Sequence, residues 1–259
     1  MAPGKLDGLV ALVTGASAGI GKYTAICFGQ EGAKVVVSAR REDKLKEVVD
    51  EIEAAGGEAV LVVGDVSKEA DCKKMVDVAI EKFGRLHVAF NNAGIFKSST
   101  FADITEGDID GLLNINVKSL AFCFKYQIPA MAKSAEGKGS IIVCSSSTAL
   151  RTPSTPAMRN GGMYAASKAA AEMLMKYAAM EGAESGVRVN TVAPGHVDTP
   201  IYGDMPSEML VGVTQATQLL KRPIKSEEIA KVVTFLASED AAMVTGSTYA
   251  MDGGWAIAA

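Results

Sequence analysis

Cysteine is scarce in this sequence of 259 residues, and its spacing argues against two classes of protein. A dense disulfide framework and a zinc site both need cysteines at close, repeated spacings. The four cysteines are widely separated and form no Cys-x-x-Cys pair: Cys27, Cys72, Cys123 and Cys144. We therefore expect reduced thiols and no bound metal.

Long runs of one chemical character are also missing. No stretch of 18 or more apolar residues is present that could span a bilayer, and the start, Met1 to Gly8, lacks the apolar core of a signal peptide. Lys and Arg total 26 against 30 Asp and Glu, a formal charge of -4 with no long basic run. We expect a cytoplasmic protein that binds neither membranes nor nucleic acids.

The sequence does contain an alternation of apolar, strand-like runs with segments of helical periodicity. Strands are predicted near residues 9–14, 34–38, 59–64, 87–91, 140–145, 187–193 and 244–250. Strands separated by helices imply right-handed crossovers and a parallel sheet that is covered on both faces. We predict one α/β domain over residues 1–259, a Rossmann fold with a doubly wound, seven-stranded parallel sheet. Ligands of such a sheet bind at the carboxyl ends of its strands.

Glycines follow the first predicted strand at once. Gly15, Gly19 and Gly21 have the spacing Gly-x3-Gly-x-Gly and lead into a segment of helical periodicity. Glycines at such a turn let a diphosphate approach the backbone, and the N-H groups at the helix N-terminus can then bind it. The turn indicates a dinucleotide site, although the same glycines would also let a helix pack closely on a sheet.

Tyr164 and Lys168 are four residues apart, so a helix would present both side chains on one face. An ammonium group beside a tyrosine favours the phenolate and lowers a pKa that is ordinarily about 10. The pair therefore predicts acid-base chemistry on an alcohol or a ketone. Taken alone, the spacing also fits a surface pair on an amphipathic helix.

Together, the segment Thr14 to Gly21 and the pair Tyr164 and Lys168 resemble the signature of the short-chain dehydrogenase/reductase family. The resemblance covers nearly the whole chain, and the Tyr-x-x-x-Lys spacing is shorter than in the enoyl-reducing branch. It implies hydride transfer between a nicotinamide cofactor and a ketone or secondary alcohol, such as a 3-oxoacyl carbonyl, a sugar or a polyol. The alternative is a dinucleotide-binding regulator or scaffold without turnover, which the intact catalytic set disfavours.

The resemblance implies a role for each residue of that catalytic set. Tyr164 would be the acid in reduction and the base in oxidation. Ser146, the middle one of three serines after the fifth predicted strand, would donate a hydrogen bond to the developing oxyanion. Lys168 would lower the pKa of Tyr164 and reach the ribose hydroxyls of the cofactor. Asn116, which the family register favours over Asn114, would hold a water that links Lys168 to solvent.

The resemblance also implies the cofactor contacts. These are Gly15, Ser17, Gly19, Ile20, Gly21, Arg40, Asp65, Val66, Asn92, Ala93, Gly94, Tyr164, Lys168, Pro194, Gly195, Val197 and Thr199. Relatives that prefer NAD carry aspartate at the position of Ala39. Arg40, assisted by Ser38, is instead placed to receive a 2′-phosphate, which predicts NADP(H) over NAD(H). The alternative is that Arg40 and Arg41 are solvated charges that open the helix predicted over 42–55.

Two segments are expected to wall the substrate pocket. Residues 147–163 form a longer connection than in many relatives, and its arginines are candidates for contact with a polar or anionic substrate. Residues 201–218 contain apolar side chains that would form a lid. His87 is expected to be packed in the fourth strand, and His196 is a candidate for a substrate contact only. The resemblance further implies a homotetramer.

Overall fold

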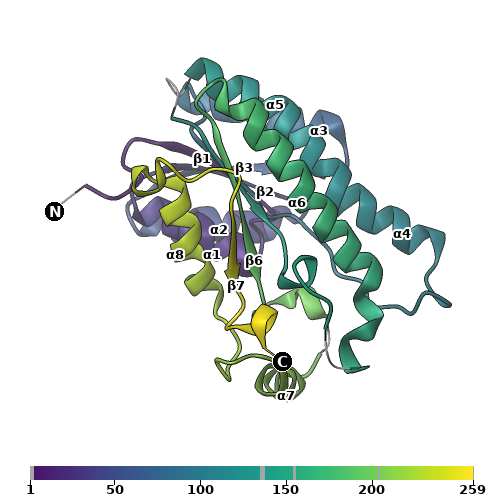
Figure 1. The fold of residues 1–259 in the computed structure, drawn as a ribbon. Helices are drawn as coiled ribbons and strands as arrows, with labels where there is room; N and C mark the ends of the chain where they lie inside the picture. The colour runs from purple at the N-terminus through teal and green to yellow at the C-terminus, as the bar shows by residue number, and fades with distance from the viewer. Residues whose placement is uncertain (1–2, 135–137, 154–155, 204, 259) are drawn as a thin grey trace.

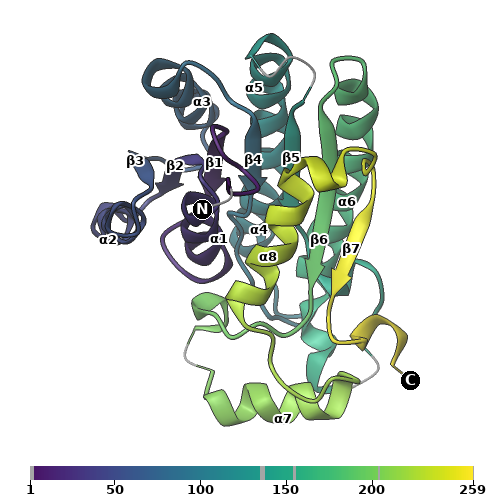
Figure 2. The ribbon, with the colours of Figure 1, turned by 90° about the vertical axis from the view of Figure 1, so that its left-hand side faces the viewer.

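A seven-stranded sheet runs through the centre of the molecule, in the order β3-β2-β1-β4-β5-β6-β7 (Figures 1 and 2). The structure is a computed structural model that describes residues 3–134, 138–153, 156–203 and 205–258. All neighbouring strands are parallel: β1 Val10–Thr14, β2 Lys34–Ala39, β3 Glu58–Val63, β4 Val88–Asn91, β5 Ser140–Cys144, β6 Arg188–Pro194 and β7 Thr248–Met251. The predicted fold class is confirmed.

Helices cover both faces of the sheet. The described α-helices are α1 Gly19–Gln30, α2 Glu42–Ala54, α3 Glu69–Phe83, α4 Glu106–Leu113, α5 Ser119–Ser134, α6 Gly162–Ala183, α7 Ser207–Thr217 and α8 Ser226–Ala237. The core on one face contains buried side chains of α1, α2 and α8, and the core on the other contains those of α3, α5 and α6. Among the residues that the structure describes, no helix combines the length and apolar character needed to cross a membrane.

Each strand serves both cores because successive side chains point to opposite faces of a sheet. In β1, Ala11 and Val13 belong to the core with α1, whereas Val10 and Leu12 belong to the core with α3. Strands buried on both faces must be apolar at every position, which explains why they appear in the sequence as continuous apolar runs.

Six of the seven predicted strands match the observed bounds to within one residue. The seventh was predicted over 244–250, but β7 begins only at Thr248. Gly246 has a φ of 68°, and its N-H group donates to the Val189 carbonyl at 2.8 Å. A left-handed glycine cannot continue a strand, so residues 244–247 form a turn that is bound to the start of β6.

The strand order reverses between β1 and β4, which lead to helices on opposite faces. The loops there diverge and open a crevice at the carboxyl ends of the strands, which is where doubly wound sheets bind their ligands. α7 lies beyond the same ends (Figures 1 and 2).

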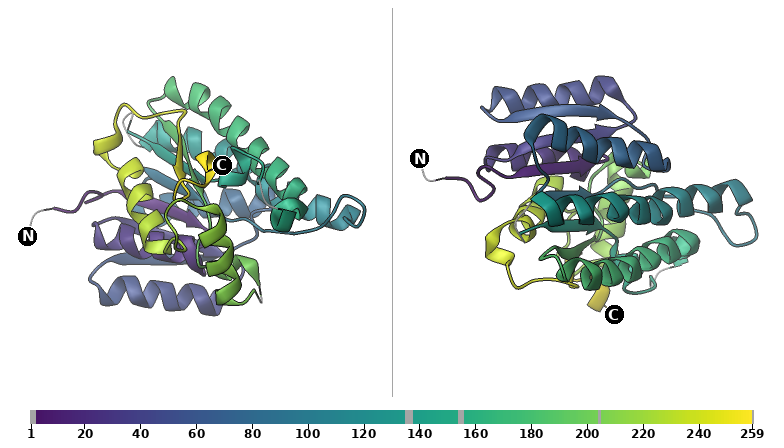
Figure 3. Two further views of the ribbon diagram at one scale, coloured as in Figure 1. Left: turned by 60° about the horizontal axis from the view of Figure 1, so that its bottom comes forward. Right: turned by 90° about the horizontal axis from the view of Figure 1, so that it is seen from above.

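A π-helical turn, η1 at Asn114–Lys118, joins α4 to α5. The three elements form one continuous rod in Figure 3. Single π-turns inside α-helices occur most often at functional sites, because the extra residue per turn shifts the side chains that follow. This turn carries Asn116.

Candidate active site

One cavity of about 1430 Å³ occupies the crevice at the carboxyl ends of the strands. Most of the site residues predicted from the sequence line it: Gly15, Ser17, Gly19, Ile20, Arg40, Asp65, Val66, Asn92, Ala93, Gly94, Ser146, Tyr164, Lys168, Pro194, Gly195, Val197 and Thr199. Gly21 and Asn116 do not line the cavity but lie directly behind its wall. Residues from distant parts of the chain are therefore brought together as predicted.

The glycine turn can form only without side chains. Gly15 and Gly19 have φ angles of 65° and 53°, which L-residues with a Cβ rarely adopt. A Cβ on Gly21 would lie 2.4 Å from the carbonyl oxygen of Gly15, so the turn could not close. Asn92 holds the turn from β4, because its Nδ2 donates to the carbonyls of Thr14 at 3.1 Å and Gly15 at 3.3 Å.

The N-terminus of α1 faces the same cavity. Its N-cap residue Ala18 provides no side-chain hydrogen bond, and the first turn holds no acidic residue. The N-H groups of this turn, together with the helix dipole, are therefore available to an anion. This turn and the glycine cradle fit the diphosphate of a dinucleotide.

The end of β2 departs from the prediction in one respect. Ser38 is fully buried, and its Oγ donates to the Val62 carbonyl at 2.8 Å, so it cannot assist Arg40 as expected. The alternation of side chains along β2 turns Ser38 away from the cavity, whereas Ala39 and the exposed Arg40 line it. The neighbouring Arg41 donates from Nη2 to Ser17 Oγ at 2.9 Å, across the rim of the cavity.

Asp65 lies beyond the end of β3, with its carboxylate fixed in place. Its Oδ1 accepts hydrogen bonds from Ser67 N at 3.0 Å and Ser67 Oγ at 2.8 Å. Partial burial opposes ionisation, but these bonds and the charge of Arg40 together lower the pKa of Asp65. Asp65 is thus a charged acceptor at the edge of the cofactor half of the cavity.

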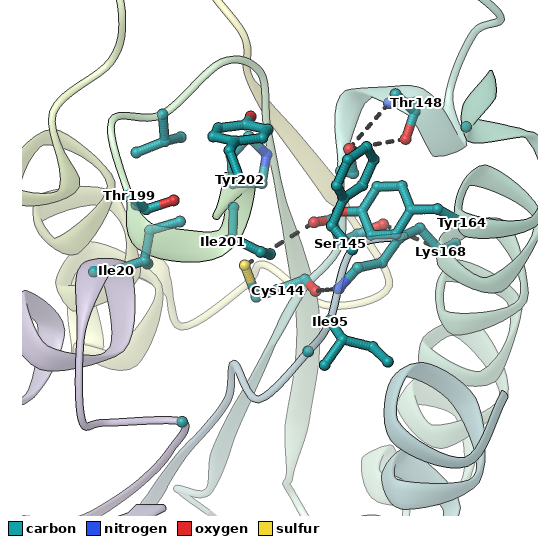
Figure 4. Close-up of a pocket in the computed structure, with 18 of the residues that line it drawn as sticks. Ile20, Ile95, Cys144, Ser145, Thr148, Tyr164, Lys168, Thr199, Ile201 and Tyr202 are labelled. Carbon is teal, nitrogen blue, oxygen red and sulfur yellow. Dashed lines mark hydrogen bonds between the residues drawn. The ribbon is translucent and has the colours of Figure 1, made fainter. Parts of the chain in front are cut away.

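Tyr164 and Lys168 lie on α6, as the spacing predicted, and both are buried (Figure 4). Lys168 Nζ donates to the Cys144 carbonyl at 2.8 Å and lies 5.9 Å from the centre of the Tyr164 ring. The expected acidic phenol is not found in this structure, because burial raises the pKa of Tyr164 above its ordinary value. A hydrogen bond with Ser146 lowers that pKa in part. Burial likewise lowers the pKa of Lys168, which weakens the effect expected of its charge.

Of the three serines after β5, Ser146 is the one whose hydrogen bonding lowers the pKa of Tyr164. Its Oγ accepts hydrogen bonds from Thr148 N at 3.3 Å and from Thr148 Oγ1 at 2.9 Å (Figure 4). Ser145 instead directs its Oγ to the Lys168 carbonyl at 3.4 Å, while its N-H group donates to the Val192 carbonyl at 2.8 Å.

Asn116 binds the loop after β4 to α6. Its Oδ1 accepts from Ile95 N at 2.9 Å, and its Nδ2 donates to Ile95 O and Ser167 Oγ, both at 3.0 Å. A Cβ on Gly94 would lie 3.2 Å from Lys168 Nζ and 3.3 Å from Asn116 Oδ1. Both amide hydrogens of Asn116 are therefore used by protein groups, and Lys168 and Asn116 approach the same glycine.

One aromatic side chain that the sequence did not single out, Phe96, covers Tyr164. The ring of Phe96 packs edge-on against Tyr164 with the centroids 5.0 Å apart, and against Tyr202 at 6.0 Å. Phe96 follows the cofactor turn after β4, and no local pattern marks such a position. Among the described residues of the expected lid, Tyr202, Met205, Met209, Leu210 and Val213 all line the cavity.

The connection over 147–163 forms the opposite wall, apart from residues 154 and 155, which lie outside the described part of the chain. Arg151 Nη1 donates to the carbonyls of Ala256, at 3.3 Å, and Ala258, and so holds the C-terminal tail. The backbone N-H of Ser99 donates to Asn160 O at 2.8 Å. Arg159 also lines the cavity.

The two histidines have different surroundings. His87 is packed as predicted, and its Nδ1 accepts from Val10 N at 2.9 Å. His196 lines the cavity, but it is buried and its Nε2 lies 3.2 Å from Thr217 Oγ1. Burial lowers the pKa of both rings, which favours their neutral forms. In the described residues, no group of three or more His, Cys, Asp or Glu side chains could hold a metal ion.

Comparison with known proteins agrees with this arrangement. Residues 15–256 match the family model described as Enoyl-(Acyl carrier protein) reductase. The chain is 37% identical to cyclohexanol dehydrogenase of Acinetobacter sp. (strain SE19), over 97% of this chain and 96% of that protein. It is 35% identical to the 3-oxoacyl-[acyl-carrier-protein] reductase FabG of Thermotoga maritima, over 98% of this chain and 100% of that protein. It is 39% identical to glucose 1-dehydrogenase of Gluconobacter oxydans, over 96% of this chain and 92% of that protein.

Solved structures show the same relationship. A short-chain type dehydrogenase/reductase from Mycobacterium marinum superposes with a TM-score of 0.90 at 31% identity, covering 97% of both chains. Levodione reductase superposes with a TM-score of 0.91 at 29% identity, covering 98% of this chain and 100% of that one. The chain belongs to the short-chain dehydrogenase/reductase family. It is an oxidoreductase that uses a nicotinamide cofactor and acts on alcohols or ketones.

Proposed function

We propose that this enzyme reduces ketones with NADPH, through Tyr164, Ser146 and Lys168, and that residues 1–259 act as a single catalytic domain. The observation that carries the proposal is the convergence of this triad and the glycine cradle on one cavity. When bound, the cofactor supplies the hydride. The protein must then orient the carbonyl, stabilise the charge that develops on its oxygen and deliver a proton to it.

The protein groups divide these tasks. Ser146 donates a hydrogen bond to the substrate oxygen, and Tyr164 protonates that oxygen from Oη. Lys168, held by the Cys144 carbonyl, stays within reach of the Tyr164 ring and supplies positive charge behind it. Asn116 fixes the Gly94 loop against which Lys168 lies, so it positions Lys168. A water relay from Lys168 would then have to pass beside the occupied Asn116 amide.

The burial of Tyr164 favours the reductive direction near neutral pH. Burial raises the pKa of Tyr164, so the hydroxyl keeps its proton at pH 7 and is ready to act as an acid. Oxidation of an alcohol needs the deprotonated form, which becomes more abundant as the pH rises.

The preference for NADPH rests on the end of β2. Ala39 lines the cavity where a carboxylate would otherwise bind the ribose hydroxyls of NAD, and Arg40 follows at the rim. A guanidinium group binds phosphate through two parallel hydrogen bonds, which suits the 2′-phosphate of NADPH. Arg41, bound to Ser17, adds positive charge to the same rim.

The substrate half of the cavity favours a ketone with an apolar body over a sugar or polyol. The wall opposite the 147–163 connection is apolar and includes Phe96, Tyr202, Met205, Met209 and Val213. Among the described lining residues, Asp65 and Asn92 are the only Asp, Glu, Asn or Gln side chains, and both belong to the cofactor half. Each sugar hydroxyl buried without a partner would cost about 1–3 kcal/mol.

The deciding experiment measures oxidation of NADPH and of NADH by the purified protein, with a panel of alicyclic ketones, β-keto esters and keto sugars. We expect turnover with the apolar ketones, faster with NADPH, and a loss of about 10² to 10⁴ in kcat for Tyr164→Phe. Cofactor binding by Tyr164→Phe, followed by fluorescence, should stay intact. Turnover that survives this substitution would disprove the mechanism, and turnover confined to keto sugars would disprove the substrate class.

We further propose a homotetramer that packs through α6. Met173, Tyr177 and Met180 are 54%, 62% and 70% exposed, and their spacing places them on one face of that helix. An exposed apolar stripe of this kind is typical of a protein interface. Sedimentation should give a tetramer, and Tyr177→Glu should give smaller species, whereas Tyr23→Glu on α1 should not. A wild-type monomer would overturn this part of the proposal.

The proposed location is the cytoplasm. The side chains of all four cysteines are free thiols, and the pKa of Cys123 on α5 is raised above its ordinary value by its neighbour Cys72 on α3 and by burial. A reducing compartment keeps such neighbouring thiols in the reduced form. Titration of the unfolded, untreated protein with a thiol reagent should therefore detect four thiols.

A further inference from the structure

Ser146 is held in an unusual hydrogen-bonding position at the end of β5. It has extended backbone angles, φ -159° and ψ 150°, and caps the short helical turn η2 at Ser147–Ala149. Thr148, in this turn, donates to Ser146 Oγ twice, from its backbone N at 3.3 Å and from its own Oγ1 at 2.9 Å. Figure 4 shows both bonds at Thr148, on the side of the cavity where Tyr164 lies.

These two bonds restrict what the Ser146 hydroxyl can do. A serine hydroxyl has one hydrogen to donate and two lone pairs with which to accept. Thr148 occupies both lone pairs, so the hydrogen of Ser146 has to point away from Thr148. The catalytic partner that lines the same cavity is Tyr164, whose pKa Ser146 lowers by hydrogen bonding. The substrate oxygen must lie between these two hydroxyls to accept from both.

We propose that Thr148 is a positioning residue, whose hydroxyl makes Ser146 an obligate hydrogen-bond donor to the substrate oxygen. This inference rests on the proposed function, because it assigns a task within that reaction. Hydrogen bonds in a chain polarise one another, so a donor that itself accepts from Thr148 binds a developing oxyanion more strongly. A donor that is already oriented also needs no rearrangement when the charge develops.

Without the Thr148 hydroxyl, one lone pair of Ser146 becomes free. Ser146 can then accept the Tyr164 proton instead of donating its own, and this arrangement directs both hydroxyls away from catalysis. The neighbouring serine cannot replace the missing donor, because Ser145 directs its Oγ to the Lys168 carbonyl. The backbone bond from Thr148 N would remain and preserve the turn.

Thr148→Val tests the proposal, since valine has nearly the shape of threonine but lacks the hydroxyl. We expect kcat for ketone reduction to fall about tenfold while KM changes less than about twofold, because one neutral hydrogen bond is lost on the way to the transition state. Thr148→Ser restores the hydroxyl and should recover most of the wild-type kcat. NADPH affinity, measured by fluorescence, should be the same in all of these proteins and reports that the site is folded.

The sharpest measurement is a double-mutant cycle with Ser146→Ala. If Thr148 acts only through Ser146, then Thr148→Val should change kcat by less than about twofold in the Ser146→Ala background. A tenfold loss that persists without Ser146 would show that Thr148 merely supports the turn and would overturn the proposal. Unchanged kcat in Thr148→Val would overturn it as well.

The same assays separate this proposal from the proposed function. Wild-type turnover that Tyr164→Phe abolishes supports the reductase whatever Thr148 does. If valine disturbs the turn, as reduced NADPH affinity would reveal, Thr148→Ala provides a second hydroxyl-free variant. Thr148→Ala is combined with Ser146→Ala in the same double-mutant cycle. A loss of kcat that Thr148→Ala causes only when Ser146 is present supports the proposal.

Discussion

The two halves of the cavity are built in different ways. The cofactor half is centred on a backbone turn, where Gly15 and Gly19 adopt φ angles of 65° and 53° and Gly21 leaves no room for a Cβ. The substrate half consists of side chains on connections and on α7. Steric requirements of the first kind allow one residue type, whereas an apolar wall can be packed in many ways. The diphosphate site of the cofactor therefore depends on the shape of the backbone, whereas the choice of substrate depends on side chains that can be exchanged.

Substitution of Gly21 should break the cofactor half for both cofactors. A Cβ in Gly21→Ala would lie 2.4 Å from Gly15 O, and Asn92 Nδ2 is as close as 2.5 Å, so the turn must move. Such overpacking typically costs about 1–3 kcal/mol, and we expect NADPH affinity in a fluorescence titration to fall about 10- to 100-fold.

A glycine of the substrate half provides the matched control. Gly212 lies in α7, and a Cβ there would have no atom within 4 Å. Gly212→Ala should leave NADPH affinity unchanged and raise the free energy of unfolding by about 0.5–1 kcal/mol. Equal losses of affinity in the two variants would contradict the proposed difference between the halves.

Arg40→Ala should sharpen the comparison within the cofactor half. Removal of a charged hydrogen-bond donor to phosphate costs about 1.5–3 kcal/mol, which is roughly a 10- to 150-fold weaker Kd for NADPH. NADH has no 2′-phosphate, so its Kd should change less than about twofold.

Lys46→Ala controls for net charge, because Lys46 is an exposed residue of α2 that pairs with Glu42 outside the cavity. Isothermal titration of the wild type and both variants with each cofactor gives the six dissociation constants needed. A loss that is equal for NADPH and NADH would show that Arg40 does not bind the phosphate.

Turnover should depend on pH where cofactor binding does not. Because burial raises the pKa of Tyr164, its acid form prevails at neutral pH and ketone reduction should be nearly constant between pH 6 and 8. Alcohol oxidation needs the base and should rise with pH by up to about tenfold per unit below that pKa. Initial rates in both directions test this, and an oxidation rate independent of pH would contradict the assignment of Tyr164 as the base.

The smallest expected effect is in the substrate wall. Tyr202→Ala removes the ring that packs against Phe96, a contact worth about 0.5–1.5 kcal/mol, so kcat/KM for an apolar ketone should fall about 2- to 13-fold. Tyr202→Phe keeps the ring and should behave like the wild type. A change in NADPH affinity in either variant would show that the two halves are not separate.

The sequence predicted the features whose causes are local. The strands are recognisable because burial on both faces demands apolar residues at every position, and the glycines because the turn excludes side chains. Tyr164 and Lys168 are found from their helical spacing together with the glycine turn near the start of the chain. The turn before β7 was missed, because a strand-like composition gives no sign that Gly246 adopts a positive φ.

Features that depend on distant parts of the chain could not be predicted. The burial of Ser38 follows from the position of β3, and the raised pKa of Tyr164 follows from how tightly the site is packed. Phe96 covers Tyr164 only because the connection after β4 lies against α6. The Thr148 bonds to Ser146 join neighbours in sequence, but their direction depends on the short turn η2, which no periodicity reveals.

The hydrogen bonds from Arg151 to the carbonyls of Ala256 and Ala258 have a practical consequence. The substrate wall is anchored through Arg151 to the carbonyls of residues 256 and 258, so a displacement of this tail acts on the wall itself. The start of the described chain lies at the opposite, amino ends of the strands, where the Leu6 N-H donates to the Glu31 carbonyl after α1. An affinity tag for purification therefore belongs at the N-terminus. A tag that follows the tail would act on the substrate wall through Arg151, without any change to a residue of the site.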